Sequence, residues 1–385
     1  MRNNKSRLIV AISIILIAFA FSLDIVNAGS TRTQAEIAAD SLKPAAGKIN
    51  DGPYVYWRSP SSITVFYNCG GEMLKRDYSG NDTIRFNGLC DDSSVVYVIP
   101  TKAPVIEPHV YTDVRRIFTI SDIHGEYDEL IEILINSQVI DSDLRWLWGD
   151  GHLVIDGDTF DRGDQVNECL WLLYRLEQEA RFGGGRVHFL IGNHEAMPLY
   201  GDIRYVNEKY TDGIVKKSRI RYEDLYGPDM ELGRWLRTKH TIVKINDILF
   251  VHAGISPEVI KRNLTINEIN ELIRDNLGAR SYMRVFNDDL KLLFKSYGPL
   301  WYRGLVEEGS YPRATREQVD KILAYFDSEA IVVGHTGVDQ VISFYDNRVF
   351  AIDVPVEDLG TLQALLWDDG VFYRVTGAGV LEEPR

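Results

Sequence analysis

The sequence predicts an α/β fold for most of the chain. Between Arg116 and Ile191, three short apolar runs alternate with two segments of helical periodicity, which is the pattern of a mostly parallel sheet. Each apolar run ends in a cluster of polar residues and glycine. Open α/β sheets place their functional sites at the carboxyl ends of such strands. The polar clusters therefore predict a functional site at one edge of the sheet.

The N-terminus has the features of a targeting segment. Basic residues precede an apolar run over residues 8–23, and Val26-Asn27-Ala28 offers a small-residue cleavage site. We therefore expect a signal peptide over residues 1–28 and an exported protein, periplasmic or secreted. An uncleaved membrane anchor is the alternative. After cleavage no stable membrane insertion is expected, because no later apolar run is long enough to span a bilayer. Residues 29–50 are small and polar and are interpreted as a linker.

Residues 51–112 are expected to form a small β-rich N-terminal subdomain. They contain four short runs of β-branched and aromatic residues, separated by Gly, Asn, Asp and Ser. For the aromatic residues we favour ordinary strand packing over ligand binding. Cys69 and Cys90 lie in this region and could pair in an oxidising compartment. Cys169 falls on a helix-like stretch and is expected to be a buried thiol.

Residues 113–385 are expected to form the main domain. Residues 200–240 are tyrosine-rich and charged, and are predicted to be a helical insertion above the sheet. Four strand candidates between Val341 and Val375 are expected to form a second sheet packed against the first. The remaining elements are expected as a strand at 248–251, helices at 266–277 and 316–326, and a strand at 330–333.

The composition describes a globular protein and limits its partners. Of the 385 residues, 45% are hydrophobic and 25% are charged, and the formal net charge is -14. This acidic balance argues against general binding to nucleic acid or to anionic lipid. It does not exclude a phosphorylated substrate, because bound metal ions can reverse the local field.

Six polar residues at the strand ends have the composition of a metal site. Carboxylate, imidazole and amide oxygen together suit Mn, Fe or Zn. Of the eight histidines in the chain, four fall in the strand-end motifs. Two divalent ions about 3.5–4 Å apart can share a hydroxide and promote an in-line displacement at phosphorus. The six candidate ligands are Asp122, His124, Asp158, Asn193, His252 and His335.

These residues belong to five motifs, which follow one another as Ser121-Asp122-Ile123-His124-Gly125, Gly157-Asp158-Thr159-Phe160-Asp161-Arg162-Gly163, Gly192-Asn193-His194-Glu195, Val251-His252-Ala253-Gly254 and Gly334-His335. In this order they resemble the calcineurin-like metallophosphoesterases, and within them the bacterial type of the phosphoprotein phosphatase branch, which is serine/threonine phosphatase-like. Ser121 departs from the glycine more usual in this branch. Gly337 stands where nuclease-like branches carry a second histidine, which favours the phosphatase branch. The resemblance implies a four-layer αββα sandwich.

The resemblance also implies two divalent metal ions, with manganese favoured and iron or zinc as alternatives. The expected ligands are Asp122 and His124 for one ion, Asn193, His252 and His335 for the other, and Asp158 as the bridge between them.

Four further residues receive roles from the resemblance. His194 is expected to protonate the leaving oxygen, and Asp161 is expected to orient its imidazole. Arg162 is expected to hold the phosphate with its planar fork of donors. Arg303, in Leu300-Trp301-Tyr302-Arg303-Gly304, is a second candidate for this role, and a surface arginine beside a packed tryptophan is the alternative interpretation.

Other polar residues near the motifs are expected to serve the structure. Asp156 is expected to make a local hydrogen bond, and Glu195 to support its turn. His152, His188 and His240 are interpreted as structural histidines.

The sequence therefore predicts an exported dimetal phosphoesterase that hydrolyses phosphomonoesters by attack of a metal-bridging hydroxide. Phosphoserine or phosphothreonine in proteins is the expected substrate, with a small phosphomonoester as another possibility. Hydrolysis of a nucleotide or dinucleoside polyphosphate is an alternative activity. A non-catalytic module that binds a phospho-ligand is the remaining alternative, and the retention of every ligand and acid position argues against it.

Overall fold

The computed structural model describes residues 50–90, 95–280, 287–309 and 311–384, which belong to one compact unit. The expected signal peptide lies outside the described residues, and so does the expected linker apart from Asn50.

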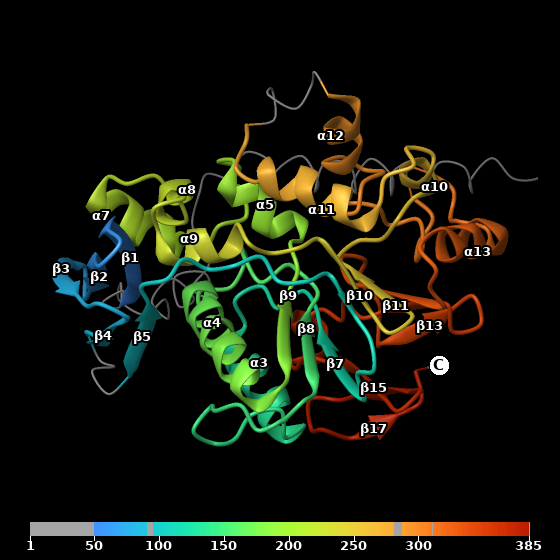
Figure 1. Ribbon diagram of the computed structural model, residues 1–385, viewed down its shortest axis with the longest axis horizontal. Helices are drawn as coiled ribbons and strands as arrows, with labels where there is room; N and C mark the ends of the chain where they lie inside the picture. The colour runs from blue at the N-terminus through green and yellow to red at the C-terminus, as the bar shows by residue number, and fades with distance from the viewer. Residues whose placement is uncertain (1–49, 91–94, 281–286, 310, 385) are drawn as a thin grey trace, which may run out of the picture. The chain divides into compact units, whose positions relative to one another are not determined.

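The described elements are numbered as in Figure 1. The strands are β1 (Asp51–Ser59), β2 (Ser62–Cys69), β3 (Glu72–Ser79), β4 (Thr83–Asn87), β5 (Val96–Pro100), β6 (Val110–Tyr111), β7 (Arg116–Ile120), β8 (His152–Ile155), β9 (Arg186–Phe189), β10 (Ile242–Ile245), β11 (Ile248–Val251), β12 (Ala330–Val333), β13 (Ile342–Phe344), β14 (Val349–Ala351), β15 (Ala364–Asp368), β16 (Val371–Val375) and β17 (Leu381–Glu382). The helices are α3 (Tyr127–Asn136), α4 (Val166–Gly183), α5 (Asn193–Leu199), α6 (Glu208–Tyr210), a π-helix (Thr211–Val215), α7 (Lys216–Ser218), α8 (Tyr222–Leu225), α9 (Glu231–Leu236), α10 (Pro257–Ile260), α11 (Ile266–Asp275), α12 (Asp288–Leu293), α13 (Arg316–Tyr325) and α14 (Val356–Leu359).

Two six-stranded mixed sheets form the centre of the unit (Figure 1). The first sheet has the order β17-β16-β15-β7-β8-β9, and the second has the order β13-β14-β12-β11-β10-β6. Strands β7, β8 and β9 are parallel, as expected. Strands β11 and β12 of the second sheet are also parallel.

The expected grouping of the strands between Val341 and Val375 was wrong. Strands β13 and β14 do join the second sheet, but β15 pairs antiparallel with β7 and brings β16 and β17 into the first sheet. Alternating apolar residues predict a strand locally, whereas its partner depends on contacts distant in sequence. The pattern therefore predicted the strands but not the sheet that each one joins.

Residues along each central strand alternate between two cores. In β8, Val154 packs between the sheets with Ile117 and Phe250, whereas Leu153 and Ile155 pack toward the helices. Both faces of the strand are buried, which explains why it is apolar throughout. On the outer faces, α4 packs on β9 and α3, and α11 packs on β10 (Figure 1). The α/β class and the αββα layering are thus confirmed.

Local signals fix the ends of the outer helices. Helix α11 begins with a capping box, in which Thr265 accepts a hydrogen bond from the Glu268 N–H and the Glu268 carboxylate accepts one from the Thr265 N–H. Helix α13 begins in the same way at Thr315. Helix α4 ends at Gly184, whose φ of 85° is the left-handed conformation that favours glycine.

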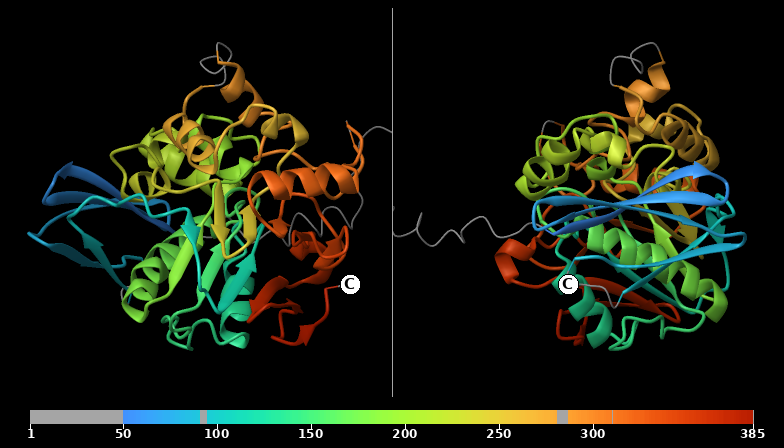
Figure 2. Two further views of the ribbon diagram at one scale, coloured as in Figure 1. Left: turned by 45° about the vertical axis from the view of Figure 1, so that its right-hand side comes forward. Right: turned by 90° about the vertical axis from the view of Figure 1, so that its left-hand side faces the viewer.

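The N-terminal strands form a three-stranded sheet, β1-β2-β3, and a β4-β5 hairpin, all antiparallel. In the right-hand view of Figure 2 these blue and cyan strands face the viewer. The Trp57 indole N–H donates to Glu231 of α9 at 2.5 Å, and the Trp171 indole of α4 donates to the Pro53 carbonyl at 2.9 Å. Tyr54 and Trp57 are buried, in keeping with the strand packing that we favoured over ligand binding.

The cysteines are arranged as the sequence suggested. Cys69 and Cys90 form a disulfide that ties the end of β2 to the segment after β4, and Cys169 is a buried thiol on α4. The bridge lies within the N-terminal strands and does not reach the two central sheets.

Residues 200–240 contain short helices, α6 to α9, and the π-helix between α6 and α7. Strand β3 was not expected, because Glu72–Ser79 carries mostly polar side chains and lies half-exposed or exposed along its length. Its register with β2 is continuous from Ser62↔Ser79 to Cys69↔Glu72.

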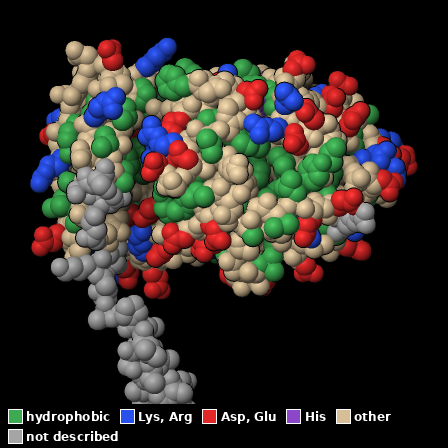
Figure 3. Space-filling view, turned by 90° about the horizontal axis from the view of Figure 1, so that it is seen from below, with side chains coloured by type: hydrophobic (Ala, Val, Ile, Leu, Met, Phe, Trp, Pro, Cys, Tyr) green, Lys and Arg blue, Asp and Glu red, His purple; other side chains and the backbone are tan. Residues whose placement is uncertain are grey.

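The face drawn in Figure 3 carries acidic and basic side chains interspersed with hydrophobic ones. Among the residues that the structure describes, none of the helices has the length and apolar character needed to cross a membrane.

Candidate metal centre and active site

The expected site residues follow the carboxyl ends of strands in both sheets. Asp122 and His124 follow β7, Asp158 follows β8, and Asn193 begins α5 just after β9. In the second sheet, His252 and His335 follow β11 and β12 in the same way. Both sheets therefore place the carboxyl ends of their strands at the site.

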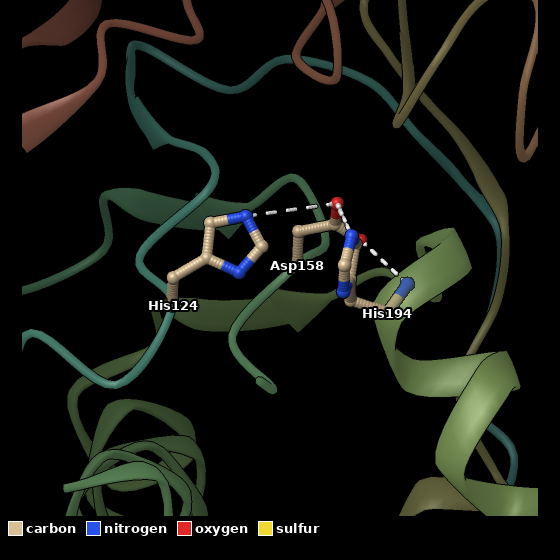
Figure 4. Close-up of side chains that lie close together, drawn as sticks. All are labelled: His124, Asp158 and His194. Carbon is tan, nitrogen blue, oxygen red and sulfur yellow. Dashed lines mark hydrogen bonds and ion pairs between the residues drawn. The ribbon is translucent and has the colours of Figure 1, made fainter. Parts of the chain in front are cut away.

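Asp158 lies at the centre of this cluster. Its Oδ2 lies 4.0 Å from His124 Nε2, 3.9 Å from His194 Nε2 and 3.1 Å from His252 Nε2. Figure 4 shows the Asp158 carboxylate between the imidazoles of His124, which comes from the loop after β7, and His194, which comes from α5. The side chain is 1% exposed. A buried carboxylate among three imidazoles has the position expected of a bridging ligand.

The other expected ligands surround this carboxylate. Asp122 Oδ1 lies 3.9 Å from His124 Nε2, and Asn193 Oδ1 lies 3.0 Å from His252 Nε2. Two groups have ligand atoms that all lie within 4.8 Å of one another. These groups are His124, Asp158 and His194, and Asp158, His252 and His335.

Hydrogen bonds leave the Nε2 atoms of two histidines directed at the cluster. The Nδ1 of His124 donates to the Phe160 carbonyl at 2.8 Å, and the Nδ1 of His252 donates to the Asp156 carbonyl at 2.7 Å. A neutral histidine that donates through Nδ1 presents Nε2 as a lone pair, which is the form that binds metal; a protonated one must first lose its Nε2 proton.

The donor set fits divalent metal ions. Among the described side chains, His124 Nε2 and His335 Nε2 are buried and have no hydrogen-bond partner. Buried polar atoms are nearly always satisfied, so unpaired nitrogens that face a carboxylate cluster indicate a missing partner. Burial lowers the pKa of His124 to about 3 and holds the pKa of His335 well below its ordinary value. Both imidazoles are therefore neutral and able to coordinate a cation.

The charge of His252 offsets the negative charge of the cluster. Burial alone would lower its pKa, but the Asp158 carboxylate raises that pKa to about 10. The positive imidazolium offsets the charge of Asp158, whose pKa lies well below its ordinary value despite burial. The cluster thus requires positive charge, which metal ions would supply in place of this proton.

The expected acid pair is formed. His194 Nδ1 lies 2.7 Å from Asp161 Oδ2, and the His194 backbone N–H donates to Asp158 Oδ1 at 2.9 Å. Burial would lower the pKa of His194, but Asp158 and Asp161 together raise it above its ordinary value. His194 can therefore hold a proton on Nε2 beside the cluster.

The two expected arginines lie at the edge of the cluster. Arg162 is exposed, and its positive charge lowers the pKa of His124 after the larger effect of burial. Arg303 donates from Nη1 to the His335 carbonyl at 2.5 Å, which places its guanidinium beside a candidate ligand. The neighbouring Trp301 packs against the His335 ring, with 5.6 Å between the ring centroids. Arg303 is therefore placed to contact an anion bound at the cluster, and the charge of Arg162 also acts on the cluster.

Six of the ten expected site residues have a positive φ. Non-glycine residues adopt this left-handed region rarely and at a cost in free energy. The loops after the strands therefore hold these side chains in fixed directions. The six residues are Asp122, His124, Asp158, Asp161, Arg162 and His335, with φ between 47° and 70°.

Two glycines permit the close approach of these loops. Gly157 has a φ of +84°, and a Cβ there would lie 2.6 Å from the His252 imidazole. A Cβ on Gly334 would overlap Ser121 Oγ and Asp122 Oδ2.

Asp156 does not behave as expected. The expected local hydrogen bond is wrong, because both carboxylate oxygens are buried without a partner within the described residues. Burial raises the pKa of Asp156 to about 8, so the group carries a proton at neutral pH. Its backbone carbonyl, rather than its side chain, serves the site by accepting the His252 Nδ1–H.

Glu195 supports the turn, as expected. Its carboxylate accepts hydrogen bonds from the backbone N–H groups of Asp158, Thr159 and Gly192 at 2.7–2.9 Å. This one side chain therefore joins the loop after β8 to the loop after β9.

The histidines interpreted as structural lie away from the cluster. His152 and His188 lie on the faces of β8 and β9 that are directed at the second sheet, and His240 precedes β10. His188 Nε2 lies 3.0 Å from His152 Nδ1, and His240 Nε2 donates to the Glu107 carbonyl at 2.8 Å. Burial lowers the pKa values of His152 and His240 to about 4.

Sequence reasoning missed two residues near the cluster. Asp353 follows β14, and burial together with Asp122 and Asp158 raises its pKa well above the ordinary value. Asp353 follows an apolar run, and a polar residue at the end of such a run is the same signal that identified Asp122. Tyr205, from the segment between α5 and α6, packs against His194 with 5.3 Å between the ring centroids. No local motif marks Tyr205.

Comparison with known proteins identifies the family. The family model described as calcineurin-like phosphoesterase matches residues 115–339, which is more than half of the chain. This protein belongs to the calcineurin-like phosphoesterases.

Two proteins and one solved structure within reach of this family are similar to the chain. Shewanella-like protein phosphatase 1 of Plasmodium berghei (strain Anka) is 31% identical over 242 residues, which cover 62% of this chain and 66% of the relative. Shewanella-like protein phosphatase 2 of Arabidopsis thaliana is 30% identical over 201 residues, covering 42% of this chain and 51% of the relative. The matched regions therefore span less than two thirds of these two relatives. A crystal structure of a cold-active protein-tyrosine phosphatase of a psychrophile Shewanella species has a TM-score of 0.81 and 38% identity, covering 87% of this chain and 99% of that one.

The close approach of Gly334 to the Asp122 carboxylate predicts that a larger residue at this position impairs metal binding. Gly334→Ala is expected to displace the Asp122 carboxylate, which accepts the His335 backbone N–H at 2.9 Å, and to weaken Mn²⁺ binding by about tenfold or more. Titration calorimetry with Mn²⁺ measures this, with the melting temperature recorded in parallel. Gly337→Ala is the matched control, because its Cβ would meet Pro355 at an ordinary 3.6 Å. Equal Mn²⁺ affinity in the two variants would contradict the expected displacement of Asp122 by a Cβ at position 334.

Proposed function

We propose that this protein is an exported, metal-dependent phosphomonoesterase that acts on phosphorylated proteins. The observation that carries the proposal is the hydrogen-bonded His194–Asp161 pair beside the Asp158 cluster. A metal-binding protein without catalysis has no need of an oriented proton donor next to its ligands. The family membership and the three phosphatase relatives support the same reaction class.

We assign the metal ligands as the motifs suggest. One ion would be held by Asp122, His124 and Asp158, and the other by Asp158, Asn193, His252 and His335, with Mn²⁺ favoured. Bound there, the ions supply Lewis acidity and an activated water nucleophile.

The chain's own side chains supply the remaining chemistry. Arg162 and Arg303 bind the phosphate oxygens and orient the group. His194 protonates the leaving oxygen from Nε2, because its Nδ1 is bonded to Asp161. Asp161 holds the imidazole in this tautomer and stabilises the proton before transfer.

Two observations bear on which phosphorylated side chain is the substrate. The motifs favour phosphoserine and phosphothreonine, whereas the Shewanella relative is named a protein-tyrosine phosphatase. The apolar segment at the N-terminus favours export.

Metal removal and a substrate panel test the proposal. We expect the chelated protein to lose turnover of phosphopeptides and to regain it with Mn²⁺, because the proposed reaction takes its activated water from the metal ions. The panel should contain phosphotyrosine, phosphoserine and phosphothreonine peptides beside a dinucleoside tetraphosphate, compared by kcat/KM. Turnover that is insensitive to chelation contradicts the metal-dependent reaction. A higher kcat/KM for the dinucleotide favours the alternative activity, and inactivity on every substrate favours a binding module.

The role of His194 predicts a dependence on the leaving group. His194→Asn should lower kcat by about 10²–10³-fold on a phosphoserine peptide, whose alkoxide leaving group requires a proton. The loss should be much smaller on p-nitrophenyl phosphate, whose leaving group is stable as an anion. Metal content should be unchanged, which serves as the control. Equal losses on both substrates would contradict the acid role.

A further inference from the structure

Tyr205 is an exposed aromatic residue that contacts the acid. The residue is 48% exposed, and its ring packs on the His194 imidazole at an interplanar angle of 49°. Scattered exposed aromatic residues are common on protein surfaces, so exposure alone carries no meaning. Contact with the proton donor distinguishes this tyrosine from an ordinary surface residue.

The segment that carries Tyr205 is held in place by backbone hydrogen bonds. The Tyr205 carbonyl accepts the Arg162 backbone N–H at 2.8 Å, and Asn207 Nδ2 donates to the Arg162 carbonyl at 2.7 Å. The Val206 N–H donates to the Ile203 carbonyl at 3.1 Å, which closes a turn. None of these bonds involves the Tyr205 side chain, so that side chain can change without loss of the turn.

The ring lies beside the imidazole that is proposed to protonate the leaving oxygen. His194 Nδ1 is bonded to Asp161, so the leaving oxygen must approach Nε2. A substituent on that oxygen can then extend toward the Tyr205 ring, whose centroid lies 5.3 Å from that of the imidazole. Ile203, in the same turn, is a second exposed apolar side chain at 39% exposure. The leaving group therefore meets an apolar, aromatic surface.

A neighbouring cation covers part of the ring. The Arg204 guanidinium lies 5.8 Å from the Tyr205 centroid and pairs with Asp202 at the edge of the turn. The residue as a whole is still 48% exposed, which leaves room for a ligand to contact it. A planar aromatic leaving group can stack on it, whereas the short alkyl chain of serine or threonine offers little contact area.

We propose that Tyr205 forms an aryl subsite that favours phosphotyrosine over phosphoserine and phosphothreonine. The inference rests on the proposed phosphatase function and assigns its specificity to one side chain. The geometry that supports it is the contact between the exposed Tyr205 ring and the His194 imidazole.

The test compares two peptides of identical flanking sequence, one with phosphotyrosine and one with phosphothreonine, on the full chain with Mn²⁺. We expect Tyr205→Ala to lower kcat/KM for the phosphotyrosine peptide by about three- to tenfold, mainly through KM, with little change for the phosphothreonine peptide. Tyr205→Phe keeps the ring and should retain the wild-type ratio. Tyr56→Ala is the matched control, because Tyr56 is similarly exposed, at 39%, but lies on β1.

The outcomes separate this inference from the proposed function. An active wild-type protein whose substrate ratio is unchanged by Tyr205→Ala overturns the aryl subsite and leaves the phosphatase function standing. A larger loss on phosphothreonine than on phosphotyrosine also overturns it, because that result means that Tyr205 acts only by positioning the acid His194. Inactivity of the wild-type protein on both peptides overturns the proposed function itself, and the subsite with it.

Discussion

The site depends on the burial of one carboxylate. Asp158 is 1% exposed and has three imidazole nitrogens within 4.0 Å of its Oδ2. A buried carboxylate costs several kcal/mol unless cations and hydrogen bonds compensate it. The protonated His252 provides this compensation, while His124 and His335 are neutral and have unpaired Nε2 atoms. The same electrostatic demand therefore makes the cluster a cation site.

The sheets and loops hold this carboxylate in place. Two sheets direct the carboxyl ends of their parallel strands to one point, and the loops beyond them adopt costly left-handed conformations at six functional residues. Glu195 joins two of these loops through backbone N–H groups, and Gly334 allows a third to approach Asp122. Backbone held in this way fixes the directions of the side chains, which is the condition for a preorganised site.

The strand-end motifs could be predicted because they are local. An apolar run followed by Asp122 or Asp158 signals both the strand and the chemistry, and the structure brings these residues together. The partner strand of β15 could not be predicted, since pairing with β7 joins residues distant in sequence. Asp156 resembles Asp158 in sequence but is buried without a partner, and only the fold reveals that difference. Tyr205 reaches His194 from the insertion through tertiary contact alone.

Metal stoichiometry tests the central role of Asp158 most directly. We predict that the chelated wild-type chain binds about two Mn²⁺ ions in calorimetry, and that Asp158→Asn weakens both by more than about a hundredfold, since even outer-shell partners contribute about 10–100-fold. Asp156→Asn is the matched control, because Asp156 is buried two residues away and should leave both ions bound. Unchanged stoichiometry and affinity in Asp158→Asn would contradict the bridging carboxylate.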